Sequence, residues 1–374
     1  MNGAGKKAVV AMSGGVDSSV AAALTLEQGY QCIGVTLKLY TGEDIAASRR
    51  GCGSETTSHT PRGCCSLADV NDARNVAFRL NMPHYVLNFT GEFREQVIRR
   101  FIETYEAGAT PNPCIDCNRY IKFDHLLLRA KQLDFDYLVT GHYARIEQDL
   151  STGRFLLKKA RDEKKDQSYV LYCLTQDQLR QTHFPLGDLT KAQVREIAGT
   201  KNFGNAEKGD SQDICFVPDR DYGAFIEAYT GKTWPPGDII GTDGTILGQH
   251  RGIIRYTIGQ RRGLGVAANE PLYVAAKSVR DNTVTLGPEA SLCARSLSVS
   301  GLNLIACPRL EKPLRVKVKT RYLQAEQDAL VEQTGEDTAR IAFDEPQRAL
   351  TPGQAAVFYD GDYVVGGGTI AAVW

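Results

Sequence analysis

The chain has 374 residues, of which 42% are hydrophobic and 24% charged, a composition typical of a soluble globular protein. It contains no apolar run approaching the ~18 residues that a membrane-spanning helix needs, which excludes an integral membrane protein. This length predicts two or three domains. The 44 basic and 44 acidic residues balance, so an RNA partner would have to bind local basic patches.

The ten cysteines do not indicate a disulfide scaffold, because such scaffolds belong to short secreted domains. The apolar run behind the two N-terminal lysines is too short for a signal peptide. We therefore expect a cytoplasmic protein that does not enter a membrane. Its cysteines are then buried apolar residues, metal ligands or reactive thiols.

The first half of the chain alternates strand and helix patterns. Short apolar runs predict strands, and apolar residues at three- and four-residue steps predict helices between them. Such alternation predicts an α/β fold, a Rossmann-like parallel sheet with helices on both faces. An aperiodic stretch at 41–63 predicts a loop. The predicted strands are 8–12, 32–39, 84–89 and 137–143, and the predicted helices are 17–27, 66–80 and 92–105.

The pattern changes after about residue 216, where a short helix at 222–229 precedes a Pro-rich linker. Short β-type runs between Gly and Asp turns follow to the C-terminus, and they predict two small β-rich domains. The expected division is an α/β domain at 1–218, a mostly β central domain at 219–290 and a β-barrel at 291–374.

A glycine-rich motif, SGGVDSS, lies between the first predicted strand and the first predicted helix, at 13–19. Glycines let the backbone approach a phosphate, and the N–H groups at a helix start bind anions. Asp17 can hold the Mg²⁺ that accompanies ATP. Because no lysine follows the glycines, the motif is not a Walker loop, and we expect it to bind a leaving pyrophosphate. Two glycines alone would favour a simple helix-capping turn.

The full SGGVDSS motif resembles the PP-loop of the N-type ATP pyrophosphatases. That resemblance implies cleavage of ATP to AMP and pyrophosphate, with transfer of AMP to a substrate oxygen. It leaves the substrate undefined.

Two further segments carry cysteines that could do chemistry. In TPNPCIDCNRYIKF the helical pattern starts at Cys117, and a thiol near a helix N-terminus favours the thiolate. Taken alone, Cys114 and Cys117 could be half a zinc site, a redox pair or neither. Cys215 lies in the apolar run ICFV, which predicts a strand end and a buried cysteine. The other cysteines are interpreted as core (Cys32, Cys173, Cys293, Cys307) or have no assigned role, with packing favoured (Cys52, Cys64, Cys65).

Eight motifs in the same order make the chain closely similar to the bacterial tRNA-specific 2-thiouridylases. The resemblance runs from residue 7 to residue 374, and the order makes it specific although each motif is modest. The motifs are SGGVDSS, TPNPCIDCNRYIKF, TGHYAR, KDQSYVLY, SQDICFV, YTIGQRRGLG, KTRY and TPGQAAVFY.

The resemblance implies sulfur transfer to C2 of the wobble uridine (U34) in the tRNAs for Lys, Glu and Gln. It implies ATP with Mg²⁺, a persulfide on Cys215 with Cys117 as its partner, and a sulfur-donor or relay protein fed by a cysteine desulfurase. The implied ATP-site residues are Ala11, Met12, Ser13, Gly14, Gly15, Val16, Asp17, Ser18, Leu37 and Gly141. The implied tRNA-binding residues are Asn112, Pro113 and Cys114 beside the target base, with His142, Lys165, Asp166, Gln167, Arg321, Tyr322 and Gln354.

Some members of that family carry Asp where this chain has Cys114. The extra thiol opens a second mechanism, in which Cys114, Cys117 and Cys215 hold a [4Fe–4S] cluster with one open iron. We favour the persulfide route slightly. The motifs also leave room for a PP-loop synthetase that acts on a small molecule and for a non-catalytic tRNA-binding module with a relic ATP loop.

Four arginines, Arg251, Arg255, Arg261 and Arg262, lie in a glycine-rich stretch that contains no acidic residue. Scattered arginines usually mark a solvated turn. Arginine with the interleaved Tyr256 also suits an RNA backbone, because guanidinium groups bind phosphates and stack on bases.

Overall fold

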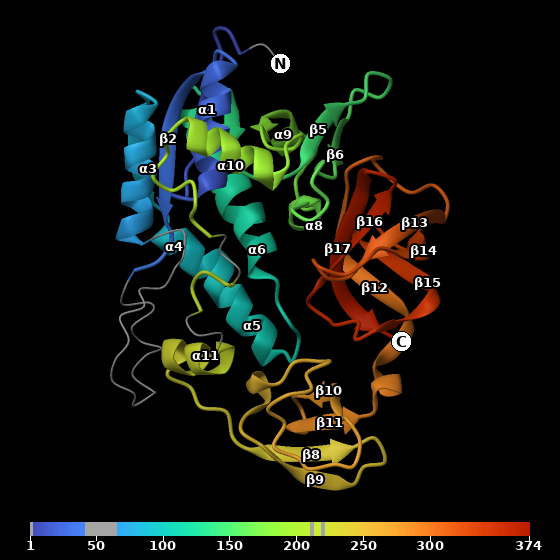
Figure 1. Cartoon of the computed structure of the whole chain (residues 1–374). Coiled ribbons are helices and arrows are strands. Elements are labelled where there is room, and N and C mark those ends of the chain that lie inside the picture. The colour runs from blue at the N-terminus through green and yellow to red at the C-terminus, as the bar shows by residue number, and fades with distance from the viewer. Residues whose placement is uncertain (1–2, 42–65, 210–212, 218–220) are drawn as a thin grey trace.

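The computed structural model describes residues 3–41, 66–209, 213–217 and 221–374 (Figure 1). Cys52, Cys64, Cys65 and nearly all of the loop predicted at 41–63 lie outside these residues. Within the described part of the chain, no helix is long and apolar enough to cross a membrane.

The N-terminal half folds around a five-stranded parallel sheet with the order β3-β2-β1-β4-β7. Four of its strands follow the predicted apolar runs, so the predicted parallel sheet is confirmed. The fifth, β7, has two residues and was not predicted, and β4 is shorter than expected. The strands are β1 (Lys7–Ala11), β2 (Gln31–Lys38), β3 (His84–Asn88), β4 (Tyr137–Val139) and β7 (Thr182–His183).

Helices cover both faces of this sheet. The side chains of β1 show this, since they alternate between two hydrophobic clusters that each contain helix residues. Ala8 and Val10 join one cluster with the first group of helices, and Val9 joins the other cluster with the second group. The first group is α1 (Val16–Glu27), α3 (Leu67–Arg79) and α10 (Lys191–Thr200). The second is α4 (Thr90–Phe93), η1 (Arg94–Arg99), α5 (Arg100–Glu106), α6 (Pro113–Asp116), η2 (Cys117–Leu126) and α7 (Leu127–Gln132).

The central part of the chain begins with α11 (Tyr222–Thr230), which packs below α5 through Phe225 (Figure 1). A four-stranded sheet with the order β10-β11-β8-β9 follows, in which β10 and β11 form an antiparallel hairpin. The elements are β8 (Gly237–Gly241), β9 (Ile246–His250), η4 (Ile253–Arg255), β10 (Tyr273–Ser278), β11 (Thr283–Gly287) and η5 (Glu289–Leu292).

The C-terminal part is a closed barrel of six strands in the order β12-β15-β14-β13-β16-β17, with β12 paired to β17. The predicted β-barrel is therefore confirmed. A hairpin of the N-terminal half, β5 (Arg145–Gln148) and β6 (Phe155–Lys158), extends the barrel sheet where Lys158 pairs with Tyr363. The barrel strands are β12 (Cys293–Leu304), β13 (Leu314–Lys319), β14 (Gln327–Gln333), β15 (Thr338–Arg348), β16 (Ala355–Asp360) and β17 (Tyr363–Val373).

The linking segment between β6 and β7 also contacts the barrel. Its two short helices are α8 (Ser168–Leu171) and α9 (Gln176–Arg180). The Asn303 side chain of β12 donates hydrogen bonds to the carbonyls of Tyr172 and Leu174 at 2.7 and 2.9 Å. The α8–α9 segment thus attaches the barrel to the sheet domain, in addition to the β6–β17 pairing.

The interpretations of five cysteines can be compared with the structure. Cys32 and Cys173 are buried as expected, and burial raises the pKa of each thiol to about 11. Cys293 is exposed, so its assignment to the core was wrong: it is the first residue of β12, and its side chain faces outward. Cys307 is half-buried. The run that contains Cys215 forms a turn and not the expected strand end.

Candidate active site

The glycine-rich loop lies at the C-terminal end of β1, where the chain enters α1. β2 and β4 flank β1 on its two sides: the chain leaves β1 toward β2, and the later connection from β3 crosses over to β4 on the opposite side. Parallel α/β sheets bind ligands at such a switch point. The predicted phosphate loop therefore occupies the position in the sheet where a nucleotide is expected.

Gly14 has a left-handed backbone, with φ at +75°. A Cβ there would overlap the carbonyl oxygen of Asp69 in α3 and lie 2.8 Å from its carbonyl carbon. Only glycine fits both conditions. The next residue, Gly15, is the N-cap of α1 and has no side-chain cap, which leaves backbone N–H groups for an anion.

The serines of the loop hold its shape. The Ser13 N–H donates to Ser18 Oγ at 3.2 Å, and the hydroxyls of Ser18 and Ser19 each donate to the Gly15 carbonyl at 3.0 Å. Thr36 of β2 donates to the Met12 carbonyl at 2.7 Å, which fixes the start of the loop. The loop is therefore pre-formed by its own hydroxyls and by β2.

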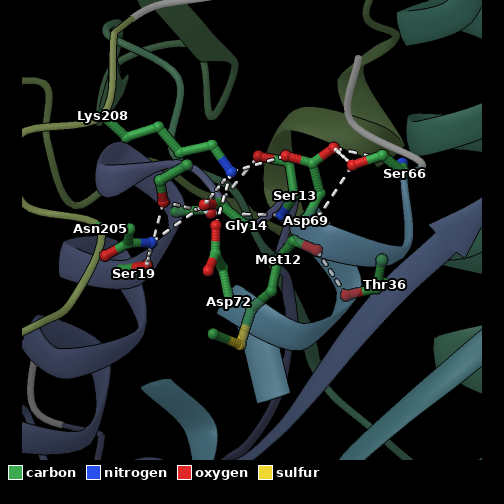
Figure 2. A network of polar contacts seen from close by, with 12 residues as sticks. Met12, Ser13, Gly14, Ser19, Thr36, Ser66, Asp69, Asp72, Asn205 and Lys208 are labelled. Atoms are coloured by element: carbon green, nitrogen blue, oxygen red, sulfur yellow. Dashed lines mark hydrogen bonds and ion pairs between the residues drawn. The ribbon is translucent and has the colours of Figure 1, made fainter. Parts of the chain in front are cut away.

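A network that the sequence did not predict holds the other side of the loop (Figure 2). Lys208 Nζ lies 2.6 Å from Asp69 Oδ1, 2.7 Å from Asp72 Oδ2 and 3.2 Å from the Gly14 carbonyl. Asn205 donates to the same carbonyl at 3.0 Å and to Ser19 Oγ at 2.9 Å. Lys208 lies three residues before the SQDICFV motif, which was the available signal, although its position in the sequence does not predict these partners.

Asp17, the expected Mg²⁺ ligand, already has protein partners. Lys191 Nζ lies 2.8 Å from both carboxylate oxygens, and the Tyr143 hydroxyl donates to Oδ1 at 2.7 Å. A Mg²⁺ ion carried by ATP would compete with the Lys191 ammonium group for this carboxylate. The phosphates would then have to supply most of its ligands.

Gly141 brings the end of β4 against the phosphate loop. A Cβ on this residue would lie 2.7 Å from the Ser18 amide nitrogen and 2.8 Å from the Asp17 carbonyl carbon. Leu37 of β2, also expected at the nucleotide, is buried in the cluster that contains Val9. The structure thus brings Gly141 to the loop, with Leu37 in the core of the same domain.

His142 is only 8% exposed and packs against the rings of Phe123 and Phe184. Thr140 Oγ1 lies 2.7 Å from its Nδ1, and Lys122 Nζ lies 3.5 Å from its Nε2. Burial, with the nearby Lys122 charge, holds the pKa of His142 well below its usual range, so the imidazole is neutral. In this arrangement His142 offers RNA very little surface.

The helix that carries the CxxC motif begins at Pro113. Cys114 therefore lies in its first turn and is exposed, whereas Cys117 lies one turn further and is half-buried. Cys117, expected near the helix N-terminus, therefore lies beyond the first turn of the helix, and Cys114 lies within it. Cys215 is half-buried, and the Tyr40 hydroxyl donates to its carbonyl at 2.9 Å.

The residues that the structure describes contain no group of three or more His, Cys, Asp or Glu side chains placed to hold a metal ion. Cys114, Cys117 and Cys215 all belong to this described set. Cysteine thiolates are the ligands that a [4Fe–4S] cluster takes, and a cluster on these three residues stays a prediction.

Of the three residues expected at the target base, Asn112 borders a cavity of about 360 Å³ between the CxxC helix and the barrel, whereas Pro113 and Cys114 do not line it. Asn112, Asp116 and Arg119 line it, and Gly353 of the barrel closes it. Burial raises the pKa of Asp116 to about 6 despite Arg100 and Arg119 nearby. On a helix, Asp116 and Arg119 face away from the direction of Cys114 and Cys117, so the cavity lies behind the cysteines.

The remaining tRNA-binding candidates are spread over two places. In the loop before α8, Asp166 accepts from the Ala160 and Ser168 N–H groups at 2.9 and 3.2 Å, and Gln167 accepts from the Tyr143 N–H at 2.9 Å. Both side chains thus stabilise the loop, next to the half-buried Lys165.

The barrel carries the other three candidates. Arg321 donates to the Ala349 carbonyl at 2.6 Å, and Tyr322 is 36% exposed. Gln354 donates at 3.0 Å to the carbonyls of Thr110 and Pro111, which ties the barrel to the segment before the CxxC helix. Gln354 thereby positions the chain beside Asn112.

The expected arginine patch is divided. Arg255 forms an ion pair with Glu227 of α11 and lies 3.5 Å from Asp221 at the start of that helix. The glycine-rich stretch itself contains no acidic residue, but Arg255 is thus paired with acidic residues from another part of the chain. Arg251, Arg261 and Arg262 are exposed. The surface available to a polyanion therefore depends on these three side chains.

Three protein families match consecutive parts of the chain. Residues 6–219 match the family described as tRNA methyl transferase HUP domain, residues 223–288 match the tRNA methyl transferase PRC-barrel domain, and residues 294–370 match the Aminomethyltransferase beta-barrel domain.

Curated relatives match over almost the whole chain. The tRNA-specific 2-thiouridylase MnmA of Acetivibrio thermocellus is 50% identical over 98% of this chain and 99% of its own length. The enzyme of the same name from Symbiobacterium thermophilum is 51% identical over 98% and 92%. A solved U34-tRNA thiolase, NcsA from Methanococcus maripaludis with its [4Fe-4S] cluster, is 14% identical, covers 62% of this chain and 71% of its own, and has a TM-score of 0.35. A likeness of that size bears on neither fold nor cofactor. By its curated relatives, the chain belongs to the tRNA-specific 2-thiouridylase (MnmA) family.

Proposed function

We propose that this protein uses ATP to replace the C2 oxygen of the wobble uridine of tRNA with sulfur. The observation that carries the proposal is the identity of about half of all residues to 2-thiouridylases over 98% of the chain. The pre-formed phosphate loop at the switch point of the sheet supports it independently, because adenylation needs a site for the leaving pyrophosphate. We place the reaction in the cytoplasm, with the tRNAs for Lys, Glu and Gln as substrates.

In the first step the uridine O2 attacks the α-phosphate of ATP and pyrophosphate leaves. The N–H groups around Gly15 and the start of α1 would bind the departing phosphates. Mg²⁺ would neutralise phosphate charge there, with Asp17 as its protein ligand. The oxygen is now part of an adenylate, which is a far better leaving group than an oxide.

In the second step the terminal sulfur of a Cys215 persulfide attacks C2, and AMP leaves with the original oxygen. The Cys117 thiolate then attacks the inner sulfur, which breaks the sulfur–sulfur bond and leaves the terminal sulfur on C2. A Cys117–Cys215 disulfide remains, and an external thiol must reduce it. A persulfide donor or relay protein, supplied by a cysteine desulfurase, would reload Cys215.

The same reaction through a [4Fe–4S] cluster on Cys114, Cys117 and Cys215 is the alternative mechanism. The third cysteine, Cys114, is the feature that favours it. We also propose that the three parts of the chain act as separate domains, 1–218 for adenylation and thiolation, with 219–290 and 291–374 as RNA-binding attachments. The ends of the matched families support this division.

The test is nucleoside mass spectrometry on unmodified tRNA for Glu incubated with the protein, Mg-ATP and a persulfide or sulfide donor. Wild type and the exposed-cysteine control Cys293→Ser should form 2-thiouridine at the wobble position, and Cys215→Ser and Cys117→Ser should not. Activity with sulfide that requires iron would favour the cluster. Absence of thiouridine, with pyrophosphate release that responds to a small molecule and not to tRNA, would refute the proposal in favour of a synthetase.

A further inference from the structure

Two arginines of the barrel meet where it joins the central sheet. Arg321 lies just beyond β13, and Arg348 is the last residue of β15. A Cβ built on Gly259, in the arginine-rich stretch of the central part, would lie 3.8 Å from Arg321 Nη2 and 4.0 Å from Arg348 Nη1. Both guanidinium groups are therefore close to one point, and the Gly259 turn reaches that point from the other side of the junction.

The two positive charges are unequally balanced. Arg348 pairs with Glu289 at 2.9 Å, and both side chains are exposed. Arg321 donates to the Ala349 carbonyl at 2.6 Å and to the Thr351 hydroxyl at 3.4 Å, and no carboxylate among the described residues pairs with it. Burial, and then the nearby Arg348 charge, lower the pKa of Arg321, although a guanidinium group stays protonated in proteins. Like charges this close repel each other, and a bound anion would offset that repulsion.

The junction is held in place by contacts of its own. The Arg348 guanidinium lies 5.0 Å from the centroid of the Tyr273 ring in β10, and the Ala349 N–H donates to the Leu292 carbonyl at 2.8 Å. On the central side, the Gly259 N–H donates to a carbonyl of β10, also at 2.8 Å. The arginines are thus positioned before a ligand arrives, which lowers the entropy cost of binding.

Glycine at 259 allows the turn to approach the barrel. Gly259 has φ at +85°, and its Cβ would lie 3.1 Å from the Ala349 Cβ, so a side chain there would be strained and would press against the barrel. The exposed Arg261 and Arg262 follow two and three residues later. Gln260 donates to the Arg262 carbonyl at 3.0 Å, which shapes their turn. The basic surface therefore continues from the barrel onto the central part.

We propose that Arg321, Arg348 and the Gly259 turn form one phosphate-binding site, which takes a backbone phosphate of the tRNA and continues onto Arg261 and Arg262. Guanidinium groups suit this ligand because their N–H donors match the geometry of phosphate oxygens. Such a contact positions the RNA without reading its sequence. The inference rests on the proposed function, which supplies the RNA. It adds Arg348 and Gly259 to the residues expected to bind tRNA.

The test measures the affinity of the whole chain for unmodified tRNA for Glu over a series of salt concentrations. Arg348→Met and the double variant Arg321→Met/Arg348→Met remove the guanidinium groups. The matched control is Arg315→Met, because Arg315 is another exposed barrel arginine that pairs with a carboxylate, Asp344. Calorimetric titration with ATP reports whether the phosphate loop is intact in each variant.

A pair of glycine variants tests the junction without changing any charge. Gly259→Ala places its Cβ against the barrel, whereas Gly265→Ala has a similar φ of +73° with nothing within 4 Å of a Cβ. Both variants bear the same backbone strain, so only the contact with the barrel differs. Gly259→Ala should weaken tRNA binding more than Gly265→Ala does, with ATP affinity equal in the two.

We expect tRNA affinity to fall about 10-fold in Arg348→Met, the effect of losing a hydrogen bond between charged groups. In the double variant the slope of log affinity against log salt should become shallower by about one, since one phosphate contact is lost. Arg315→Met should match wild type. Weaker binding with an unchanged salt slope would overturn the inference, because the arginines would then only join the barrel to the central part. Unchanged affinity in the double variant would overturn it as well. Failure of the proposed function would look different, because wild type would then form no 2-thiouridine, whatever the tRNA affinities of the variants.

Discussion

Replacing Gly14 with alanine tests the geometry of the phosphate loop. At φ of +75° alanine costs about 1–2 kcal/mol relative to glycine. Its Cβ would also overlap the backbone of Asp69, a rigid neighbour, which adds about 1–3 kcal/mol. We therefore expect Gly14→Ala to lower the free energy of unfolding by about 2–5 kcal/mol. Because the Gly15 N–H moves with the loop, ATP affinity should fall at least about 10-fold.

Two other glycines provide controls. Gly5 has a similar φ of +80° with nothing within 4 Å of a Cβ, so Gly5→Ala isolates the backbone cost. Gly15 has an ordinary φ, and its Cβ would lie 3.6 Å from Ser13 Oγ, so Gly15→Ala should fold normally. Urea unfolding followed by circular dichroism gives the stabilities, and calorimetric titration gives ATP affinity. If Gly14→Ala were no less stable than Gly5→Ala and bound ATP like wild type, the close approach to Asp69 would not exist.

Three further predictions concern charge and burial. Arg261→Glu/Arg262→Glu should weaken tRNA binding and flatten its salt dependence while ATP binding stays intact, whereas unchanged tRNA affinity at moderate salt would dismiss the patch. Because Asp116 has a folded-state pKa of about 6, above its ordinary 3.8, stability should fall as pH rises through that window. Asp116→Asn should remove this pH dependence of the free energy of unfolding, which amounts to up to about 3 kcal/mol at pH 8. Urea unfolding at several pH values measures it. Iodoacetamide should alkylate the exposed Cys293 long before Cys173, as peptide mass spectrometry would show.

Local patterns in the sequence predicted the architecture well. The strand and helix periodicities reflect which residues are buried, so β1, β2, β3 and α3 could be placed within a residue or two of their observed bounds. The two-residue β7 is too short to produce a pattern. By its position in the sequence the β5–β6 hairpin belongs to the first domain, and only the fold shows that β6 pairs with the barrel strand β17.

The parts of the site that the sequence missed depend on contacts between distant residues. Lys208 meets Gly14 and Asp69 across 194 and 139 residues, and no spacing rule reports such pairs. Lys191 reaches Asp17 across 174 residues in the same way. Cys293 was misassigned because apolar neighbours suggested a core, whereas the barrel turns its side chain outward. Motifs thus predicted candidate site residues, and only the fold shows which distant side chains contact them.

The most direct measurement follows the oxygen that leaves the uridine. The tRNA substrate carries ¹⁸O at C2 of the wobble uridine, and AMP from the reaction is analysed by mass spectrometry. Adenylation of O2 predicts that the label appears in AMP, in an amount equal to the 2-thiouridine formed. Thiouridine formed with unlabelled AMP would contradict the account, because the oxygen would then have left without ever being bonded to phosphorus.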